Sequence, residues 1–230
     1  SKKLKAKGIP QISETAIVER DILITEYVKK AHYHVQHISC GRSIDMLRDA
    51  KRKKINVTGE ACPHHFILDE TALLKYGTNA KMNPPLRTKK DVSEIVKGIK
   101  DGTIDVVCTD HAPHTGEEKS RGLDKAPFGI IGLETAIGLT YTFLVKKKII
   151  TFEKMIELMS INPRKILNLK QPGIRIGVKA NLTFLDTKAK WKVNVNKFKS
   201  KSRNTPFGEY NLQCKPYAVL NNSKLYFTDL

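Results

Sequence analysis

An apolar run that leads directly into ligating side chains constrains this chain more than any other feature. Residues 104–107 read Ile-Asp-Val-Val, and residues 108–114 read Cys-Thr-Asp-His-Ala-Pro-His. A short β-branched run is typical of a buried strand, and side chains just past the carboxyl end of a parallel strand face the site in many enzymes. Asp110 is therefore a candidate site residue. A turn or helix-cap role is the alternative, but Pro113 argues against a helix that begins here.

The segment after this stretch, from His114 to about Gly132, is long and rich in glycine and proline. Loops of this length inside compact domains are more often lids or binding loops than plain connectors. We therefore expect this loop to border a site.

Upstream of the loop, helix-like and strand-like segments alternate. The predicted helices are 12–30, 44–54 and 91–101, and the predicted strands are 32–39, 55–60 and 104–107. Ser13 is the expected cap of the first helix, Asp91 and Glu94 form the expected capping box of the third, and Gly102 ends it. Such alternation predicts right-handed βαβ units and a parallel sheet, that is, an α/β fold.

Later in the chain the pattern changes. Thr151 is the expected cap of one of the later helices, and from Gln171 onward the segments 181–186, 217–220 and 224–227 are typical of short strands. We therefore divide the chain into an α/β part, residues 1–169, and a small β unit, residues 170–230.

Composition argues against several classes of function. The net charge of +18 arises from 41 Lys and Arg against 23 Asp and Glu. Most of the excess is lysine spread over polar faces and the tail, with few aromatic residues for stacking on bases, so a solvated surface is favoured over nucleic-acid binding. No apolar stretch is long enough to span a bilayer, and residues 1–5 do not begin a secretory signal. The four cysteines lack CxxC spacing, which predicts free thiols and a cytoplasmic location.

Several short segments, in order along the chain, resemble motifs of the dihydroorotases, cyclic amidohydrolases of the amidohydrolase superfamily. They are His-Ile-Ser at 37–39, Pro-His-His at 63–65, Lys-Met-Asn-Pro-Pro-Leu-Arg at 81–87, Thr-Asp-His-Ala-Pro-His at 109–114, Ala-Pro-Phe-Gly-Ile at 126–130, Gly-Leu-Glu-Thr at 132–135 and Asn-Thr-Pro-Phe at 204–207. The resemblance implies a partial TIM (β/α)8 barrel, comprising strands six to eight and their helices, followed by the later strands of a small β-sandwich.

Several metal-binding residues of the family are missing from this chain. A His-x-His pair on the first barrel strand, an acidic residue or modified lysine on the fourth and a histidine on the fifth have no counterpart in the sequence. The barrel part, about residues 11–169, is also short of the roughly 250 residues of a closed barrel. We therefore expect the C-terminal portion of a dihydroorotase, inactive without the missing half.

The resemblance also implies the site. His37 and Asp110 correspond to zinc ligands, with two zinc ions expected per complete site, and Asp110 is the expected proton carrier in the reversible hydrolysis of dihydroorotate to N-carbamoyl-L-aspartate. The remaining matched positions are the expected substrate contacts, namely Asn83, His114, Phe128 and Gly129.

The other histidines considered have no expected ligand role. Alternation along a strand places His37 on the same face as Val35 and turns His34 toward the helices, so we expect no ligand role for His34. His64, His65 and His111 are expected to be structural or to orient other groups through hydrogen bonds.

Two alternatives remain open. One is a non-catalytic, dihydroorotase-like scaffold that partners aspartate transcarbamoylase, and the other is a hydantoinase or allantoinase. Retention of His37, Asp110, Asn83 and His114 together favours an enzyme over a scaffold. The expected partners are the small-molecule substrate, the missing half of the barrel and further copies of the chain in a homo-oligomer, with no nucleic acid and no membrane.

Overall fold

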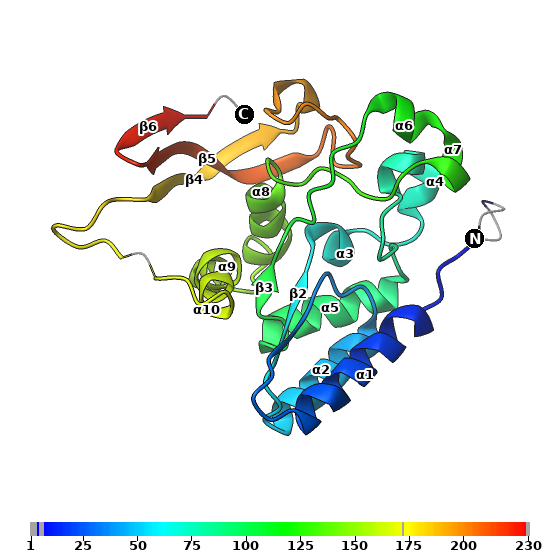
Figure 1. Cartoon of the computed structure of the whole chain (residues 1–230). Coiled ribbons are helices and arrows are strands. Elements are labelled where there is room, and N and C mark those ends of the chain that lie inside the picture. Colours follow the sequence, from blue (N-terminus) through cyan, green and yellow to red (C-terminus); the bar gives the residue numbers. More distant parts are fainter. Residues whose placement is uncertain (1–3, 5–6, 172, 229–230) are drawn as a thin grey trace. The chain divides into compact units, whose positions relative to one another are not determined.

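The computed structural model describes residue 4, residues 7–171 and residues 173–228 (Figure 1). These form two compact units. One comprises residues up to Gly132 together with Ser202–Pro206, and the other comprises Leu133–Lys201 together with the residues from Phe207 onward. The helices that follow Leu133 thus belong to the same unit as the later strands. The division at residue 169 follows the expected family domains and stays a prediction.

The first unit is built on a parallel sheet. Its strands are β1 (Tyr33–Val35), β2 (Val57–Ala61) and β3 (Val106–Val107), in the order β1-β2-β3. Both pairs run parallel. The predicted α/β fold with a parallel sheet is confirmed.

Three long helices accompany this sheet. Helix α2 (Gly41–Arg52) contacts both α1 (Ile12–Tyr27) and α5 (Lys89–Asp101), and Figure 1 shows the three alongside one another. A Cβ atom added to Gly59 of β2 would lie 2.5 Å from Cδ2 of Leu47 in α2. The glycine therefore lets α2 approach this face of the sheet closely.

The start and the end of α1 differ from the prediction. The helix ends at Tyr27 rather than at Lys30, and Ser13 does not cap it. The cap position is Gln11, and the Ser13 hydroxyl donates to the carbonyl of Pro10 at 2.7 Å because Ser13 already lies inside the first turn.

The capping box of α5 lies one helical turn before the predicted pair, Asp91 and Glu94. It joins Thr88 and Asp91, because the helix begins at Lys89 and Asp91 is its third residue. Glu94 instead pairs with Lys97 at 2.8 Å on the helix surface. Gly102 ends the helix with a φ of +84°, as predicted.

The second unit combines short helices with an antiparallel sheet. The helices are α8 (Ala136–Thr140), α9 (Phe152–Ile156) and α10 (Asn162–Ile166), and the sheet has the order β4-β5-β6, formed by β4 (Leu182–Lys192), β5 (Asn211–Asn221) and β6 (Lys224–Phe227). Thr151 caps α9 by accepting the N–H of Lys154 at 3.1 Å, as predicted. The predicted strands are confirmed, and β4 and β5 are longer than the sequence indicated.

The remaining helices are short connectors. They are α3 (Pro63–Ile67), α4 (Ala72–Tyr76), α6 (Gly116–Ser120) and α7 (Gly122–Lys125), with π or 3-10 turns at Gly77–Ala80, Tyr141–Val145, Glu157–Ile161 and Val195–Lys197. The glycine-rich loop 114–132 thus contains two of these helices. Across the described ranges, no helix is long and apolar enough to cross a membrane.

Candidate active site

The two candidate metal ligands lie just past the carboxyl ends of parallel strands. His37 follows β1, Cys62 follows β2 and Asp110 follows β3. Because the strands run parallel, these ends share one edge of the sheet, which is where sites are built in α/β folds. The predicted position of Asp110, just past a strand, is confirmed.

His37 leaves the strand geometry. Its φ of +35° interrupts the extended backbone that ends at Val35, and its N–H donates to Oε1 of Glu60 at 3.2 Å. The ring atom Nδ1 is buried and has no hydrogen-bond partner among the described residues. His37 lines a cavity of about 320 Å³ together with Asn83, so the structure brings these two predicted site residues together.

His34 lies on the opposite face from the one predicted. Its Nδ1 is 2.7 Å from the hydroxyl of Thr58, and its Nε2 is 3.1 Å from Oε2 of Glu60. Both partners are half-buried residues of β2 that alternate with the buried positions of that strand.

The reason is the length of β1. Gly59 of β2 faces α2, and its register partner Val35 is buried on the same side, so His34 points away from α2. The prediction extended the two-residue period from Val35 to His37, but the strand ends before His37 and the period ends with it. The prediction that His34 faces the helices is therefore wrong.

Glu60 orients both histidines, and the sequence analysis assigned it no role. Burial alone would raise its pKa, but hydrogen bonds from His34, the Cys108 thiol and the His37 N–H outweigh burial and hold the pKa below the usual carboxyl value. The signal was present in the alternation of Thr58 and Glu60 along β2, which places both on the face away from α2.

Asp110 and His37 suit a metal ion. Asp110 is half-buried with a φ of +47°, and its carboxylate makes no hydrogen bond or ion pair within the described ranges. A carboxylate oxygen and a neutral imidazole nitrogen are ordinary zinc donors. The buried, unpartnered Nδ1 of His37 therefore fits a ligand role, and the residues present fit part of a zinc site.

A second group of predicted residues lies in the loop after Asp110. Nε2 of His114 is 2.9 Å from the carbonyl of Phe128, which joins the two ends of the loop. Asn204 strengthens this junction: its Oδ1 accepts the N–H of His114 at 3.2 Å, and its Nδ2 donates to the carbonyl of Gly129 at 3.2 Å. The structure thus brings His114, Phe128 and Gly129 together, through an asparagine to which the sequence analysis gave no separate role.

Lys119 provides another support for the same segment. Its side chain is buried, and Nζ donates to the carbonyls of Pro127 and Gly129 at 3.0 Å each and to that of Lys81 at 3.4 Å. Burial, with a smaller contribution from the charge of Lys81, lowers the pKa of Lys119 to about 8. No sequence pattern distinguished this lysine from the many on the surface.

Gly129 is confined by its surroundings. Its φ is +117°, and an added Cβ atom would lie 2.4 Å from Cβ of Ala112. Its N–H donates to the carbonyl of Lys81 at 3.0 Å, and its carbonyl accepts from Lys119 and Asn204. The main chain of Gly129 is therefore already engaged within the protein.

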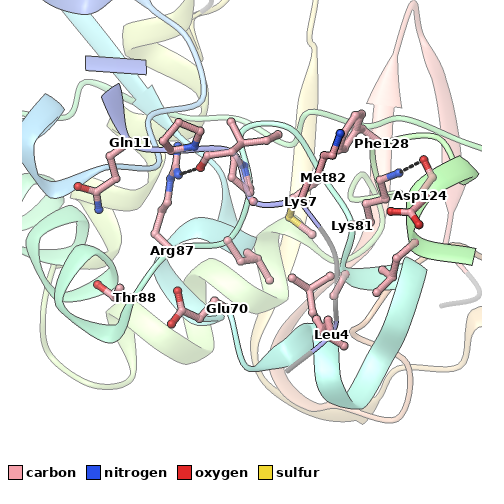
Figure 2. A pocket seen from close by; sticks show the side chains of 18 residues that line it. Leu4, Lys7, Gln11, Glu70, Lys81, Met82, Arg87, Thr88, Asp124 and Phe128 are labelled. Carbon is pink, nitrogen blue, oxygen red and sulfur yellow. Dashed lines mark hydrogen bonds between the residues drawn. The ribbon is translucent and has the colours of Figure 1, made fainter. Parts of the chain in front are cut away.

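A larger cavity of about 880 Å³ adjoins this segment. Figure 2 shows Arg87 reaching the carbonyl of Ile9 and Lys81 pointing toward the main chain of Asp124. Phe128 is the predicted site residue that lines it, with its ring under Nζ of Lys81 at 4.5 Å. Ile9, Pro85 and Arg87 line both cavities, so the two spaces are neighbours.

His111 behaves as the sequence analysis expected. Its Nδ1 accepts the N–H of Gly132 at 3.1 Å, and the residue forms a bridge with Ile130. It therefore supports the loop.

Comparisons with known proteins agree on one family. A model of the amidohydrolase family matches residues 5–224. The chain is 42% identical over 219 residues to a dihydroorotase of Acetivibrio thermocellus, covering 95% of the chain and 51% of that protein. It is 44% identical over 225 residues to a dihydroorotase of Bacillus cytotoxicus, covering 98% and 52%. The chain thus spans about half the length of the curated relatives it matches.

Solved structures share the fold. An L-hydantoinase (dihydropyrimidinase) from Arthrobacter aurescens matches with a TM-score of 0.90 at 22% identity, covering 99% of the chain and 53% of that protein. A dihydropyrimidinase from Brevibacillus agri matches with a TM-score of 0.86 at 24% identity, covering 96% and 50%. At these identities the likeness concerns the fold alone.

Proposed function

This chain belongs to the amidohydrolase family, and we propose that it is part of a zinc-dependent dihydroorotase. The observation that carries the proposal is the carboxyl edge of the sheet, where His37 presents a buried, unpartnered ring nitrogen beside Asn83 and Asp110 follows the third strand. The dihydroorotase relatives at 42% and 44% identity support it. The reaction is the reversible hydrolysis of dihydroorotate to N-carbamoyl-L-aspartate, a step of de novo pyrimidine (UMP) biosynthesis.

The proposed architecture follows from the same edge. The strands β1, β2 and β3 with their helices form part of a (β/α)8 barrel, and residues 170–230 supply strands of a β-sandwich. The parallel order of the strands and the likeness to solved hydantoinases support this proposal. Because the chain spans about half of its relatives, the remaining ligands and strands belong to residues outside it.

In the proposed mechanism, His37 and Asp110 would hold zinc together with ligands from outside this chain. Bound zinc supplies a Lewis acid that polarises a carbonyl and lowers the pKa of water. Asp110 takes the proton from the attacking water and delivers it to the ring nitrogen as the bond between that nitrogen and the carbonyl carbon breaks. Its half-buried position suits that task, and no described residue makes a competing hydrogen bond to its carboxylate.

The other predicted residues orient the substrate. Asn83 offers an amide to the ring edges, and His114 and the main chain at Phe128 lie at the loop that borders the larger cavity. The N–H of Gly129 is committed to Lys81, so Gly129 acts here by shaping the loop. Interactions that hold the ring for attack raise the rate by removing misaligned poses.

Complementation tests the proposal. Residues 1–230 are purified alone and after co-expression with the amino-terminal half of the Acetivibrio thermocellus dihydroorotase, and dihydroorotate turnover is measured in both directions with zinc analysis. We expect no turnover by the chain alone and turnover by the pair. Asp110→Asn should lower kcat by about 10²–10⁴-fold with a smaller change in zinc content.

The control is Asp49→Asn, an exposed carboxylate of α2 that lines neither cavity, which should leave the rate unchanged. Turnover by the zinc-loaded chain alone that Asp110→Ala abolishes would contradict the expectation that the other half is required. A folded pair that turns over hydantoin and not dihydroorotate would establish the hydantoinase alternative. A folded pair that binds aspartate transcarbamoylase but turns over neither would establish the scaffold alternative.

A further inference from the structure

A cluster of buried thiol and imidazole groups lies at the end of β2 and takes no part in the proposed reaction. Cys62, His64 and His65 each offer one ligand atom, and these atoms all lie within 4.8 Å of one another. All three residues are buried, with the two histidines each 2% exposed. The short helix α3 starts at Pro63 and folds the Cys-Pro-His-His segment so that these side chains converge.

Two ring nitrogens of the cluster have no partner. Nε2 of His64 and Nδ1 of His65 are buried and make no hydrogen bond to any described residue. Leaving a buried polar atom unsatisfied costs about 1–3 kcal/mol, and folded proteins rarely do so. Both rings of the buried cluster therefore lack a partner, and a cation that accepts one lone pair from each ring would supply it.

The tautomer of His65 is suited to metal binding. Its Nε2 lies 3.0 Å from the carbonyl of Pro84, and because a carbonyl only accepts, Nε2 carries the hydrogen and Nδ1 carries the lone pair. Histidine ligands of metals commonly donate their other N–H to a main-chain carbonyl in this way. Burial also lowers the pKa of His65 to about 4 and that of His64 well below its usual value, so both rings stay neutral.

A second thiol borders the cluster. Sγ of Cys108 lies 3.3 Å from Sγ of Cys62, because the two cysteines follow the register pair Ala61 and Val107 of adjacent strands. Zn–S bonds of about 2.3 Å in a tetrahedral site place two sulfurs roughly 3.8 Å apart, so a small shift brings this pair to that spacing. Two cysteines and two histidines are a common donor set of tetrahedral zinc sites.

We infer that Cys62, His64 and His65 bind a zinc-class divalent cation. Cys108 lies outside this group of three and its thiol donates to Glu60, so it joins as fourth donor only by turning from Glu60 toward the cation. This site shares no residue with the His37 and Asp110 pair and does not depend on the proposed activity. A disulfide between Cys62 and Cys108 is the competing arrangement. It would account for the two thiols but leave both ring nitrogens unpartnered.

Cobalt titration tests the inference on the whole chain. Residues 1–230, reduced and stripped of metal with a chelator, are titrated with Co²⁺ as a spectroscopic stand-in for zinc. We expect the near-ultraviolet absorption of cobalt bound to thiolate together with the visible bands of tetrahedral cobalt, both displaced by zinc. Cys62→Ser, which leaves Cys108 as the single thiolate, should remove about half or more of the thiolate absorption, and His65→Gln should weaken binding at least about tenfold.

Matched controls separate the cluster from other groups. Cys40→Ser removes an equally buried thiol of the same unit and should leave the absorption intact. Asp110→Asn should leave it intact as well, which keeps this test independent of the proposed catalytic zinc. Absence of thiolate absorption in the reduced chain, or undiminished absorption in folded Cys62→Ser, overturns the inference.

A measurement on the unaltered chain covers the case in which the variants do not fold. Alkylation is followed at each cysteine by mass spectrometry with and without zinc. Zinc should protect Cys62 and Cys108 while Cys40 and Cys214 react at unchanged rates. Two results overturn the inference. One is alkylation of Cys62 and Cys108 at the same rates with and without zinc, and the other is a Cys62–Cys108 disulfide that forms even in the presence of zinc.

Discussion

Two parts of the first unit hold candidate site residues by different means. At the sheet edge, His34 and His37 are held by Glu60, a neighbour on the adjacent strand. In the loop after Asp110, Pro127 and Gly129 are held by Lys119, and Gly129 also by Asn204, whose side chains hydrogen-bond to main-chain carbonyls. Strand pairing does most of the positioning in the first part, and buried polar side chains do it in the second.

The difference predicts where the molecule is vulnerable. A loop without a hydrogen-bond ladder depends on a few buried groups, and the loss of one leaves several carbonyls unsatisfied. A strand retains its ladder when one side chain is lost. Substitutions in the loop should therefore destabilise the chain more than substitutions at the sheet edge.

The largest effect is expected for Gly129→Ala. The residue has a φ of +117°, and the new Cβ would lie 2.4 Å from Cβ of Ala112, so strain and overpacking should together lower the free energy of unfolding by about 4 kcal/mol. Urea denaturation measures this. Gly116→Ala is the control, because a Cβ there meets nothing within 4 Å. Adding Ala112→Gly should restore part of the loss. Equal stability of the two alanine variants would refute the account.

Lys119→Met should have the next largest effect. The variant keeps the apolar stem but removes the donor to three carbonyls, so the free energy of unfolding should fall by about 3 kcal/mol. The exposed Lys125, replaced by Met, is the control in the same loop. A Lys119→Met variant as stable as Lys125→Met would show that the carbonyls find other partners.

The pH dependence of the Lys119 effect sharpens this result. Burial, and next the charge of Lys81, lower the folded-state pKa of Lys119 from 10.5 to about 8. Between these values the unfolded chain binds more protons, so the stability of the wild type relative to Lys119→Met should rise with pH across this window. Urea titrations of both proteins at several pH values measure the difference.

Asn204→Ala should be milder. The variant loses hydrogen bonds to His114, Ala112 and Gly129, which should lower the free energy of unfolding by about 2 kcal/mol because water reaches part of the loop. Hydrogen exchange should increase at the His114 amide more than in β2. The exposed Asn211 provides the control substitution. Unchanged exchange at His114 would show that Asn204 does not hold the loop.

The same comparison explains what the sequence could predict. The α/β fold, the parallel strands and the place of Asp110 follow from local apolar patterns, and they are confirmed. The faces of β1 were misassigned because a two-residue period holds only within a strand, and the positive φ of His37 lies beyond it. The N–H groups of His37 and Ile38 donate to Glu60 of β2, and no local pattern encodes these contacts.

Lys119 and Asn204 illustrate the second limit. Their roles arise from carbonyls that folding brings together, over separations as long as the 92 residues between Ala112 and Asn204. The residue type alone does not show whether a lysine is buried or exposed. The roles of His37, Asp110, Asn83 and His114 rest on the family resemblance, and they stay predictions until the kinetic variants are measured.

The smallest effect is expected at the sheet edge, for His34→Gln. Loss of the 3.1 Å contact with Glu60 should lower the free energy of unfolding by about 1 kcal/mol at neutral pH, since the ladder between β1 and β2 remains. His32→Gln is the matched control, because this exposed ring contacts Thr58 at 2.9 Å but not Glu60.

Acid sensitivity decides whether Glu60 is the partner that matters. The pKa of Glu60 is held below its ordinary value of 4.5 in spite of burial, so its ionised form stabilises the fold above 4.5, and this contribution is lost as pH falls through the folded-state pKa. His34→Gln removes the leading hydrogen bond that lowers this pKa. The difference from wild type should therefore shrink as pH falls below 4.5, while His32→Gln shows no such trend. A constant difference for His34→Gln would mean that Thr58, and not Glu60, carries the stabilisation.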